Sequence, residues 1–317
     1  MSDAGKAGSR VGPIVDAHFH LWNLRENRYP WLQDDPPIPF RYGSYAALRD
    51  RNFLPDDYRS AWAGWSVARA VAVEAEWDRE DSVGETRWID SIARATGVPD
   101  AFVAHARLEA ADVDEMLRQH AEFPIVRGIR QKPALESRVP GGSLMSNRRW
   151  RDGYELLSGH GFHYELQAPF PFLDEAVELA EAYPDTPIVL NHAGLPSDRS
   201  PTGLEGWRSC MRRFASVPLA SVKISGLGGS DGSWDCASNQ RIVRDLVGIF
   251  GTDRCMFASN YPVDSLCVGF AEMYTCYETA VADLTDEERR KLFHDNAVRI
   301  YRLDAQPVDE NRTVPQY

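Results

Sequence analysis

The sequence predicts an α/β protein, a single-domain (β/α)8 TIM barrel with a long loop after its first strand. Eight β-like runs alternate with helical segments along 317 residues, and eight parallel βαβ units close a barrel. The length agrees, because α/β barrels of roughly 250 residues fold as one domain. A doubly wound open sheet competes, but it usually has a glycine-rich turn where this chain has His18-Phe19-His20.

The expected strands are short apolar runs, as is typical of strands buried on both faces of a parallel sheet. We expect them at Ile14–His20, Val67–Glu74, Ala101–Arg107, Ile125–Arg130, Phe162–Gln167, Ile188–His192, Ala220–Ser225 and Arg254–Ser259. The barrel is expected to span residues 13–304, between a disordered N-terminal tail (1–12) and a polar C-terminal tail (305–317).

The expected helices have apolar residues at helical spacing. They are Val83–Ala95, Val113–Ala121, Trp150–Gly159, Phe172–Tyr183, Leu204–Ala215 and Ile242–Phe250. A last helix is marked by Thr285 and Glu288, which have the spacing of a capping box. Between the first two strands, residues Leu21–Ser66 are predicted to form a long loop at the C-terminal rim, and loops of that length are usually functional.

Charge and composition limit the partners and the compartment. Asp and Glu exceed Lys and Arg by 47 to 35, a net charge of −12, which argues against nucleic acid or an anionic membrane as the main partner. Five cysteines without a C-x-x-C pair predict neither a disulfide framework nor a structural zinc site. Without a long apolar run or a signal peptide, the chain is expected to be cytoplasmic. A small-molecule substrate is the expected partner, and a homo-oligomer is compatible with the sequence.

Histidines at the ends of two strands are the strongest chemical signal. In the run Asp16-Ala17-His18-Phe19-His20, alternation would place Asp16, His18 and His20 on one face. Two imidazoles near the top of the barrel can bind a divalent metal or an anionic group, or can be hydrogen-bonded structural residues. His192 ends the sixth strand, so a three-histidine site with an open coordination position is predicted.

Charged residues near other strand ends add to this site. They are Glu74, Arg130, Glu165 and Lys223. Each alone could be a solvated rim charge or part of a structural ion pair, but Arg130 and Lys223 together indicate a substrate with negative charge or a developing oxyanion. His105 and His163 are expected to pack in the interior or to support the site residues from behind. The aromatic residues Trp22, Tyr29 and Trp31 could wall the pocket or pack the long loop.

Several motifs resemble the amidohydrolase-related family, in particular its branch of sugar-acid lactonases and 2-pyrone-4,6-dicarboxylate lactonase. The motifs are Asp16–Trp22 (DAHFHLW), Tyr29–Leu32 (YPWL), Arg127–Gln131 (RGIRQ), Leu190–Gly194 (LNHAG), Val222–Leu227 (VKISGL) and Asn296–Leu303 (NAVRIYRL). The resemblance implies a (β/α)8 barrel, hydrolysis of a lactone or similar ester, and a site at the C-terminal rim. Some members of this branch are metal-dependent and others are metal-free.

One departure from the family pattern concerns the eighth strand. The family's strand ends Ser-Asp-Trp-Pro, and its aspartate serves as metal ligand and general base, whereas this chain has Asn260 at that position. An amide can bind a metal or form a hydrogen bond, but it cannot accept a proton from water. Asp264 and Glu165 are the candidate replacements, although Asp264 could instead be a turn residue after Pro262.

The sequence as a whole predicts a hydrolase that opens a small anionic or hydroxylated lactone. His18, His20 and His192 would polarise the carbonyl, directly or through one divalent metal, with Zn²⁺ as the expected ion and metal-free catalysis also open. Asp264 or Glu165 would activate water beside Asn260. Substrate would bind to Arg130, Lys223, Glu74 and Trp22. Two alternatives remain: a decarboxylase of an aromatic or unsaturated acid, and a barrel that binds a ligand without turnover.

Overall fold

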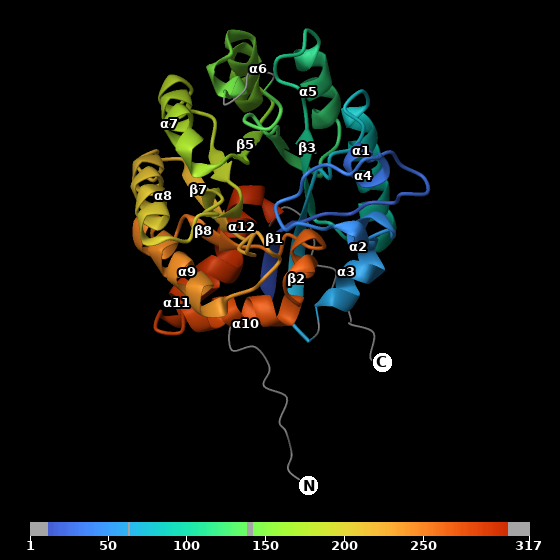
Figure 1. Cartoon of the computed structure of the whole chain (residues 1–317). Coiled ribbons are helices and arrows are strands. Elements are labelled where there is room, and N and C mark those ends of the chain that lie inside the picture. Colours follow the sequence, from blue (N-terminus) through green and yellow to red (C-terminus); the bar gives the residue numbers. More distant parts are fainter. Residues whose placement is uncertain (1–11, 63, 138–141, 304–317) are drawn as a thin grey trace.

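The computed structural model describes residues 12–62, 64–137 and 142–303. Eight parallel strands form one sheet in the order β1 to β8, and the helices surround it, as Figure 1 shows. The strands are β1 (Ile14–Phe19), β2 (Val67–Val73), β3 (Ala101–His105), β4 (Val126–Arg130), β5 (His163–Leu166), β6 (Ile188–Leu190), β7 (Ala220–Ile224) and β8 (Cys255–Phe257). The predicted (β/α)8 barrel is confirmed. The expected tails lie outside the described residues, apart from Gly12.

The barrel closes between the ends of its first and last strands. The amide of His20 donates to Tyr261 O at 2.7 Å, and the amide of Asn260 donates to His18 O at 2.8 Å. These bonds follow the parallel bridge between Phe19 and Tyr261. The strand-one and strand-eight candidates for the active site are therefore held side by side by backbone hydrogen bonds.

The predicted helices are confirmed, with ends shifted by a few residues. They are α4 (Ser82–Thr96), α5 (Val113–Ala121), α6 (Arg148–Gly159), α7 (Leu173–Ala182), α8 (Pro201–Phe214) and α9 (Cys236–Phe250). The Thr285–Glu288 capping box begins α11 (Asp286–Arg290), which continues through a π-helical turn into α12 (Asn296–Tyr301). Helix α10 (Phe270–Ala280) was not predicted, because its buried residues cover a broad face and give weak periodicity.

The long segment predicted between β1 and β2 is present, and it contains short helices that the sequence did not predict. It contains three short helices, α1 (Pro30–Gln33), α2 (Ala46–Arg49) and α3 (Pro55–Ala61), and an antiparallel bridge between Trp22 and Phe53. Its aromatic rings stack on one another, for example Trp31 on Phe40 with centroids 5.7 Å apart. This aromatic packing gives the segment a small core of its own.

A register shift in β1 corrects the prediction that Asp16, His18 and His20 share a face. Pairing with β2 is irregular between Asp16 and Phe19. Asp16 points toward the helical layer, where it accepts hydrogen bonds from Tyr58 of α3 at 2.7 Å and Tyr274 of α10 at 3.3 Å. Such a bulge re-aims the side chains that follow it, and His18 and His20 point to the other side.

A disulfide between Cys236 and Cys276 is a second correction, because the sequence analysis expected none. The bridge joins the first residue of α9 to α10, with the two Cα atoms 5.8 Å apart. The sequence could not reveal it, since α10 itself was missed and the two cysteines are 40 residues apart. Cys210, Cys255 and Cys267 are free.

The N-terminal half of the barrel interior is apolar and is covered by α12. Val15, Ala17 and Val103 pack there against Ala297 and Tyr301. This leaves the C-terminal half of the interior for polar residues, as is usual in this architecture. Within the described ranges, no helix has the length and apolar composition needed to cross a membrane.

Candidate active site

Three histidines gather at the C-terminal ends of β1 and β6. The Nε2 atoms of His18 and His20 lie 3.2 Å apart, and the ring centroids of His18 and His192 lie 4.7 Å apart. All three side chains are buried. His192 follows β6 in a 3-10 turn and has a φ of 52°, a conformation that is costly for a residue other than glycine. The structure thus brings together the three residues that the sequence had grouped.

Burial keeps these imidazoles neutral. It lowers the pKa of His20 to about 3, with the charge of Arg130 adding to the effect. The pKa values of His18 and His192 also lie well below the ordinary value, first because of burial and then because of Lys223 and Arg41, respectively. A neutral imidazole can bind a metal or exchange a proton with a substrate.

Asn260 connects His20 to Asp264. Its amide nitrogen donates to Asp264 Oδ1 at 2.7 Å, and its Oδ1 therefore faces His20 Nε2 at 3.3 Å. Asn260 has a φ of 53°, which asparagine tolerates better than most residues. The residue that replaces the family's aspartate is thus a fixed bridge between an imidazole and a carboxylate.

Asp264 is a buried carboxylate and not a solvated turn residue. Tyr42 Oη donates to its Oδ1 at 2.8 Å, and the amide of Gly226 donates to its Oδ2 at 2.9 Å. Burial raises its pKa, against the opposing effects of Arg41 and these hydrogen bonds. A carboxylate with a raised pKa is a stronger base toward water.

Glu165, the other candidate base, is held by four partners. Lys223 Nζ lies 2.7 Å from its Oε2, Tyr301 Oη donates to its Oε1 at 2.6 Å, and the Asn191 amide donates to Oε2 at 2.6 Å. His163 completes the set at 3.3 Å. Burial alone would raise the pKa of Glu165, but Lys223 and His163 bring it below the ordinary value. This environment suits a counterion better than a base.

Lys223 links this ion pair to the histidines. Its Nζ lies 3.5 Å from His18 Nδ1 as well as beside Glu165. Burial lowers the pKa of Lys223 to about 8, although Glu165 acts in the opposite direction. Lys223 therefore contacts His18 while Glu165 balances its charge.

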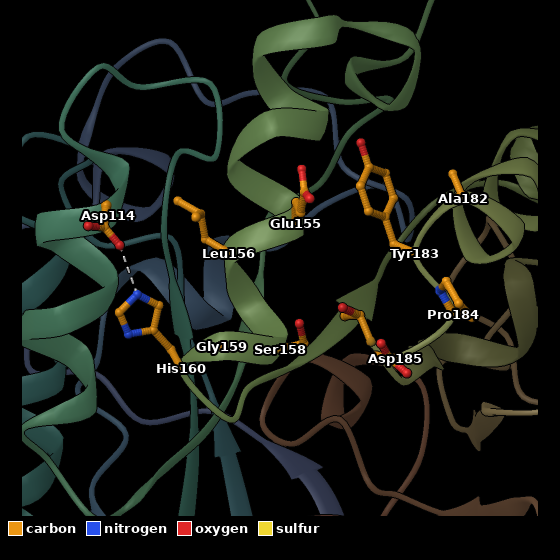
Figure 2. A pocket seen from close by; sticks show the side chains of 11 residues that line it. Asp114, Glu155, Leu156, Ser158, Gly159, His160, Ala182, Tyr183, Pro184 and Asp185 are labelled. Atoms are coloured by element: carbon orange, nitrogen blue, oxygen red, sulfur yellow. Dashed lines mark hydrogen bonds and ion pairs between the residues drawn. The ribbon is translucent and has the colours of Figure 1, made fainter.

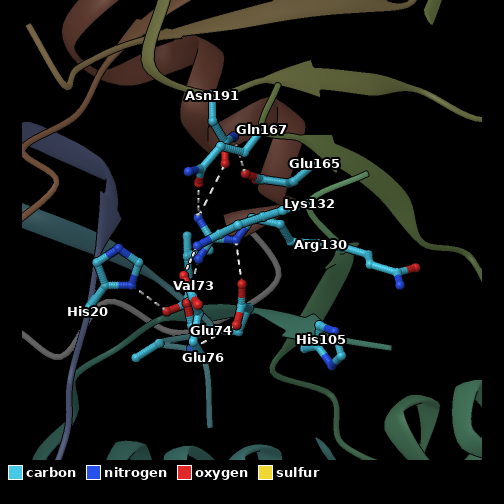
Figure 3. Close-up of polar contacts among 12 residues, drawn as sticks. His20, Val73, Glu74, Glu76, His105, Arg130, Lys132, Glu165, Gln167 and Asn191 are labelled. Atoms are coloured by element: carbon cyan, nitrogen blue, oxygen red, sulfur yellow. Dashed lines mark hydrogen bonds and ion pairs between the residues drawn. The ribbon is translucent and has the colours of Figure 1, made fainter. Parts of the chain in front are cut away.

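Arg130 is also paired, as Figure 3 shows. Its Nε lies 2.8 Å from Glu74 Oε1, and its Nη1 donates to Gln167 Oε1 at 3.0 Å. Burial would raise the pKa of Glu74, but Arg130 and Arg79 bring it well below the ordinary value. Both Arg130 and Glu74 are buried, so the solvated-rim interpretation is excluded and a structural ion pair is what the structure contains.

Two site residues were missed by the sequence analysis. Arg41 and Tyr42 come from the segment between α1 and α2, yet Tyr42 reaches Asp264, and Arg41 Nη2 donates to Gly226 O and to Tyr42 Oη at 2.6 Å. The only signal was the richness of that segment in Arg and Tyr. No spacing rule links residue 41 to residue 264.

Four other candidates have packing or supporting contacts. Trp22 packs against Trp31 and Phe53, and its indole donates to Arg51 O at 2.9 Å, which supports a role in loop packing. His105 bonds to Ser82 at 2.9 Å. His163 contacts Glu165, as described above, while Tyr29 packs against Trp77.

The donor atoms around His20 fit a divalent cation in type. His20 Nδ1 lies 2.9 Å from Val73 O, so Nδ1 carries the proton and Nε2 has a lone pair. This lone pair faces the Asn260 amide oxygen, and a cation would relieve the contact between two acceptors. Within the described part of the chain, no group of three or more His, Cys, Asp and Glu residues has the arrangement of a metal centre.

A large cavity lies elsewhere on the molecule. It has a volume of about 550 Å³ and is lined by residues of α5, α6 and the turn after α7, including His160 and Tyr183 (Figure 2). His160 pairs there with Asp114 at 3.0 Å. This cavity shares no residue with the histidine site, so its size does not identify it as the centre of the chemistry.

Comparisons with known proteins agree with the motifs. An amidohydrolase family model matches residues 15–303. An uncharacterized protein of Sinorhizobium fredii, y4mH, is 35% identical over 92% of this chain and 98% of its own length. The L-fucono-1,5-lactonase of Burkholderia multivorans is 25% identical over 93% of this chain and 97% of its own. A crystal structure of a Burkholderia multivorans amidohydrolase with bound zinc superposes with a TM-score of 0.76 at 24% identity, covering 92% of this chain and 99% of that one. The chain therefore belongs to the amidohydrolase family of hydrolases.

Proposed function

We propose that this hydrolase is a lactonase that opens a small lactone by water attack at the site of His18, His20 and His192. The observation that carries the proposal is the meeting of three buried neutral imidazoles with a buried carboxylate at the C-terminal ends of the strands. The name of the L-fucono-1,5-lactonase relative supports the same reaction class.

The imidazoles act on the lactone carbonyl. With Nδ1 of His18 facing Lys223 and Nδ1 of His192 facing Ser225, the Nε2–H groups of these two rings donate to the carbonyl oxygen and stabilise the negative charge that develops on it as water adds. Lys223 orients His18, and the Ser225 hydroxyl, 2.9 Å from His192 Nδ1, orients His192. Because these groups are fixed and dry, they need little rearrangement as the charge forms.

Asp264 is the base of the proposed reaction. It takes a proton from water, the water oxygen bonds to the carbonyl carbon, and the ring carbon–oxygen bond breaks. Asp264 then returns the proton to the ring oxygen, and the new carboxylic acid ionises, releasing one proton per turnover near neutral pH. The raised pKa of Asp264 supports this role over Glu165, whose pKa is lowered by its partners.

A divalent metal, Zn²⁺ first, would be held by His18, His20 and His192 with the Asn260 amide oxygen beside them. Neutral imidazole nitrogens are preferred zinc ligands, and a similar solved structure contains zinc. When bound, such an ion would supply Lewis-acid polarisation of the carbonyl.

A lactone panel followed with a pH indicator tests the proposal. Asp264→Asn should lower kcat by roughly 10²–10⁴, and kcat/KM by the same factor, because the proton moves only in the transition state. Asp245→Asn is the matched control, since Asp245 pairs with Arg208 on the outer helices. Turnover by Asp264→Asn equal to that of the control would remove Asp264 as the base, and a panel without any opened lactone would contradict the lactonase assignment.

A further inference from the structure

Two arginines from different loops donate hydrogen bonds to adjacent backbone carbonyl groups beside the histidine site. Arg41, from the segment after β1, donates through Nη2 to Gly226 O. Arg199, from the segment before α8, donates through Nη2 to Leu227 O at 3.1 Å. Gly226 and Leu227 are consecutive in the loop after β7, so the two guanidinium groups are anchored to neighbouring points.

This pair borders the reaction site itself. A Cβ atom built on Gly226 would lie 2.8 Å from the Cβ of His192 and 3.0 Å from Arg41 Nη2. The same glycine donates its amide to Asp264. A group bound by the arginines would therefore lie next to the proposed general base and to one of the histidines.

Neither arginine has a carboxylate partner in an ion pair within the described residues. The other cations of the site do: Arg130 pairs with Glu74, and Lys223 pairs with Glu165. The charge of Arg41 is offset by Asp264 through the Tyr42 hydroxyl. Arg199 forms no such ion pair, although the charge of Asp235 acts on it from beyond ion-pair distance.

Arg199 also has a buried donor that nothing in the described structure satisfies. Its Nη1 is buried and has no hydrogen-bond partner. Burial lowers the pKa of Arg199; the nearby Tyr42 opposes this and Arg41 adds to it, so the two arginines feel each other's charge. A buried guanidinium N–H without an acceptor costs free energy, and a ligand oxygen at this position would supply the acceptor.

We propose that Arg199 and Arg41 bind a carboxylate on the substrate, so that the preferred substrate is a lactone bearing one carboxylate group. The inference rests on the proposed lactonase function and replaces Arg130 and Lys223 as the anion-binding residues. A planar guanidinium matches a carboxylate through two parallel hydrogen bonds. A carboxylate monoanion matches this pair better than a phosphate dianion, whose second negative charge would lie close to Asp264.

The proposal also defines the product. Water adds to the lactone carbonyl, the ring oxygen leaves as a hydroxyl group, and the product is a hydroxy acid with two carboxylates. The substrate carboxylate remains on the arginines throughout, so its binding energy fixes the position of the ring without taking part in the bonds that form and break.

Binding of two matched probes tests this subsite without relying on turnover. The probes are tetrahydrofuran-2-carboxylate and its carboxamide, which have similar size and differ in charge, and which the enzyme cannot hydrolyse because they lack the lactone carbonyl. Titration calorimetry on the wild type should give a carboxylate preference on the order of tenfold to a hundredfold, the usual range for a charge-assisted hydrogen bond. Arg199→Met should abolish this preference. Arg208→Met, which removes an arginine paired with Asp245, should retain it.

Arg41→Met provides the second variant, with its unfolding temperature measured because Arg41 also anchors the segment between β1 and β2. It should weaken binding of the carboxylate more than binding of the carboxamide. Equal affinity of the wild type for the two probes, or a preference retained in Arg199→Met, would overturn the subsite. The protein could instead show a carboxylate preference that depends on Arg199 and yet open no lactone. That result would support the subsite and contradict the lactonase proposal.

Discussion

At the scale of single residues, the exchange of aspartate for Asn260 changes which group can accept a proton. Asn260 is fixed in one orientation, because its nitrogen donates to Asp264 and its oxygen faces His20. The sequence alone could show that the usual carboxylate was absent. It could not show that Asp264 lies within hydrogen-bond distance of the replaced residue, because this depends on the turn at Tyr261 and Pro262.

Restoring the aspartate tests this contact. In Asn260→Asp, two carboxyl groups would share the space where nitrogen and oxygen are now 2.7 Å apart. Two carboxylates at such a distance cannot both ionise readily, so the pKa of Asp264 should rise. The base works only when it is ionised. As the pH is lowered, the variant should therefore lose activity at a higher pH than the wild type does. The pH profile of kcat/KM measures this shift.

Asn147→Asp is the matched control, because Asn147 caps α6 far from the site and aspartate caps equally well. If the profile of Asn260→Asp superimposes on those of the wild type and the control, residue 260 does not influence the pKa of the proposed base.

Glu85 provides a residue-scale prediction about stability. Its Oε1 accepts a hydrogen bond from the Ala75 amide at 2.7 Å, and its Oε2 is a buried atom without a partner in the described structure. Burial, with Glu74 nearby, raises the pKa of Glu85 from 4.5 to about 8. The folded state therefore holds a proton that the unfolded state releases, and the stabilisation present below the unfolded pKa is lost as the pH rises toward 8.

In Glu85→Gln, this loss should disappear. Between about pH 5 and pH 8, the free energy of unfolding of the wild type should fall relative to the variant, at up to about 1.4 kcal/mol per pH unit. Urea denaturation at several pH values measures the difference, with the exposed Glu155→Gln as control. Parallel curves for the wild type and Glu85→Gln would show that Glu85 is ionised in the folded protein.

At the scale of elements, the alternation of side chains along β1 correctly predicted that His18 and His20 lie near the site. It wrongly predicted that Asp16 lies on the same face, whereas Asp16 faces the surrounding helices. The register shift between Asp16 and Phe19 is set by pairing with β2 and by the hydroxyl groups that hold Asp16. Neither partner is visible in a local pattern. The three helices between β1 and β2 were missed for a similar reason, since each has only four to seven residues.

The segment between α1 and α2 contributes to the site through Tyr42. Removing its hydroxyl in Tyr42→Phe takes away a donor that lowers the pKa of Asp264. We therefore expect the acidic limb of the kcat/KM profile to move to higher pH, with kcat reduced about tenfold, as for loss of one hydrogen bond to a charged group. Tyr45→Phe is the control, because Tyr45 lies in the same segment and donates to Trp31 O. Identical profiles for the two variants would exclude a role for Tyr42 at the base.

The bridge between α9 and α10 predicts a count of thiols and a change in stability. Without reductant, the unfolded protein should show three reactive thiols out of five cysteines. Replacing Cys236 and Cys276 by serine should lower the free energy of unfolding by up to about 4 kcal/mol, the loop-entropy value for a closed loop of this length. Cys210→Ser should leave it unchanged. Five reactive thiols without reductant would show that the bridge does not form.

At the scale of the whole molecule, the barrel could be predicted because each strand is a short apolar run and each helix between them has regular spacing. The three histidines could be grouped because strand ends meet at one rim. The pairing of charges could not be predicted, since Arg130 with Glu74 and Lys223 with Glu165 join residues 56 and 58 positions apart. Because these partners occupy Arg130 and Lys223, our proposal assigns anion binding to Arg41 and Arg199, neither of which lies on a strand.

The most direct test of the central claim is the fate of water oxygen in the reaction. Butyrolactone carboxylate is incubated with the enzyme in water enriched in heavy oxygen, and the product is analysed by mass spectrometry together with released carbon dioxide. Lactone opening by water attack predicts a hydroxy acid with one heavy oxygen in its new carboxylate and no carbon dioxide, with the product absent when Asp264→Asn is used. Release of carbon dioxide, or an unchanged lactone across the whole panel, would contradict the account.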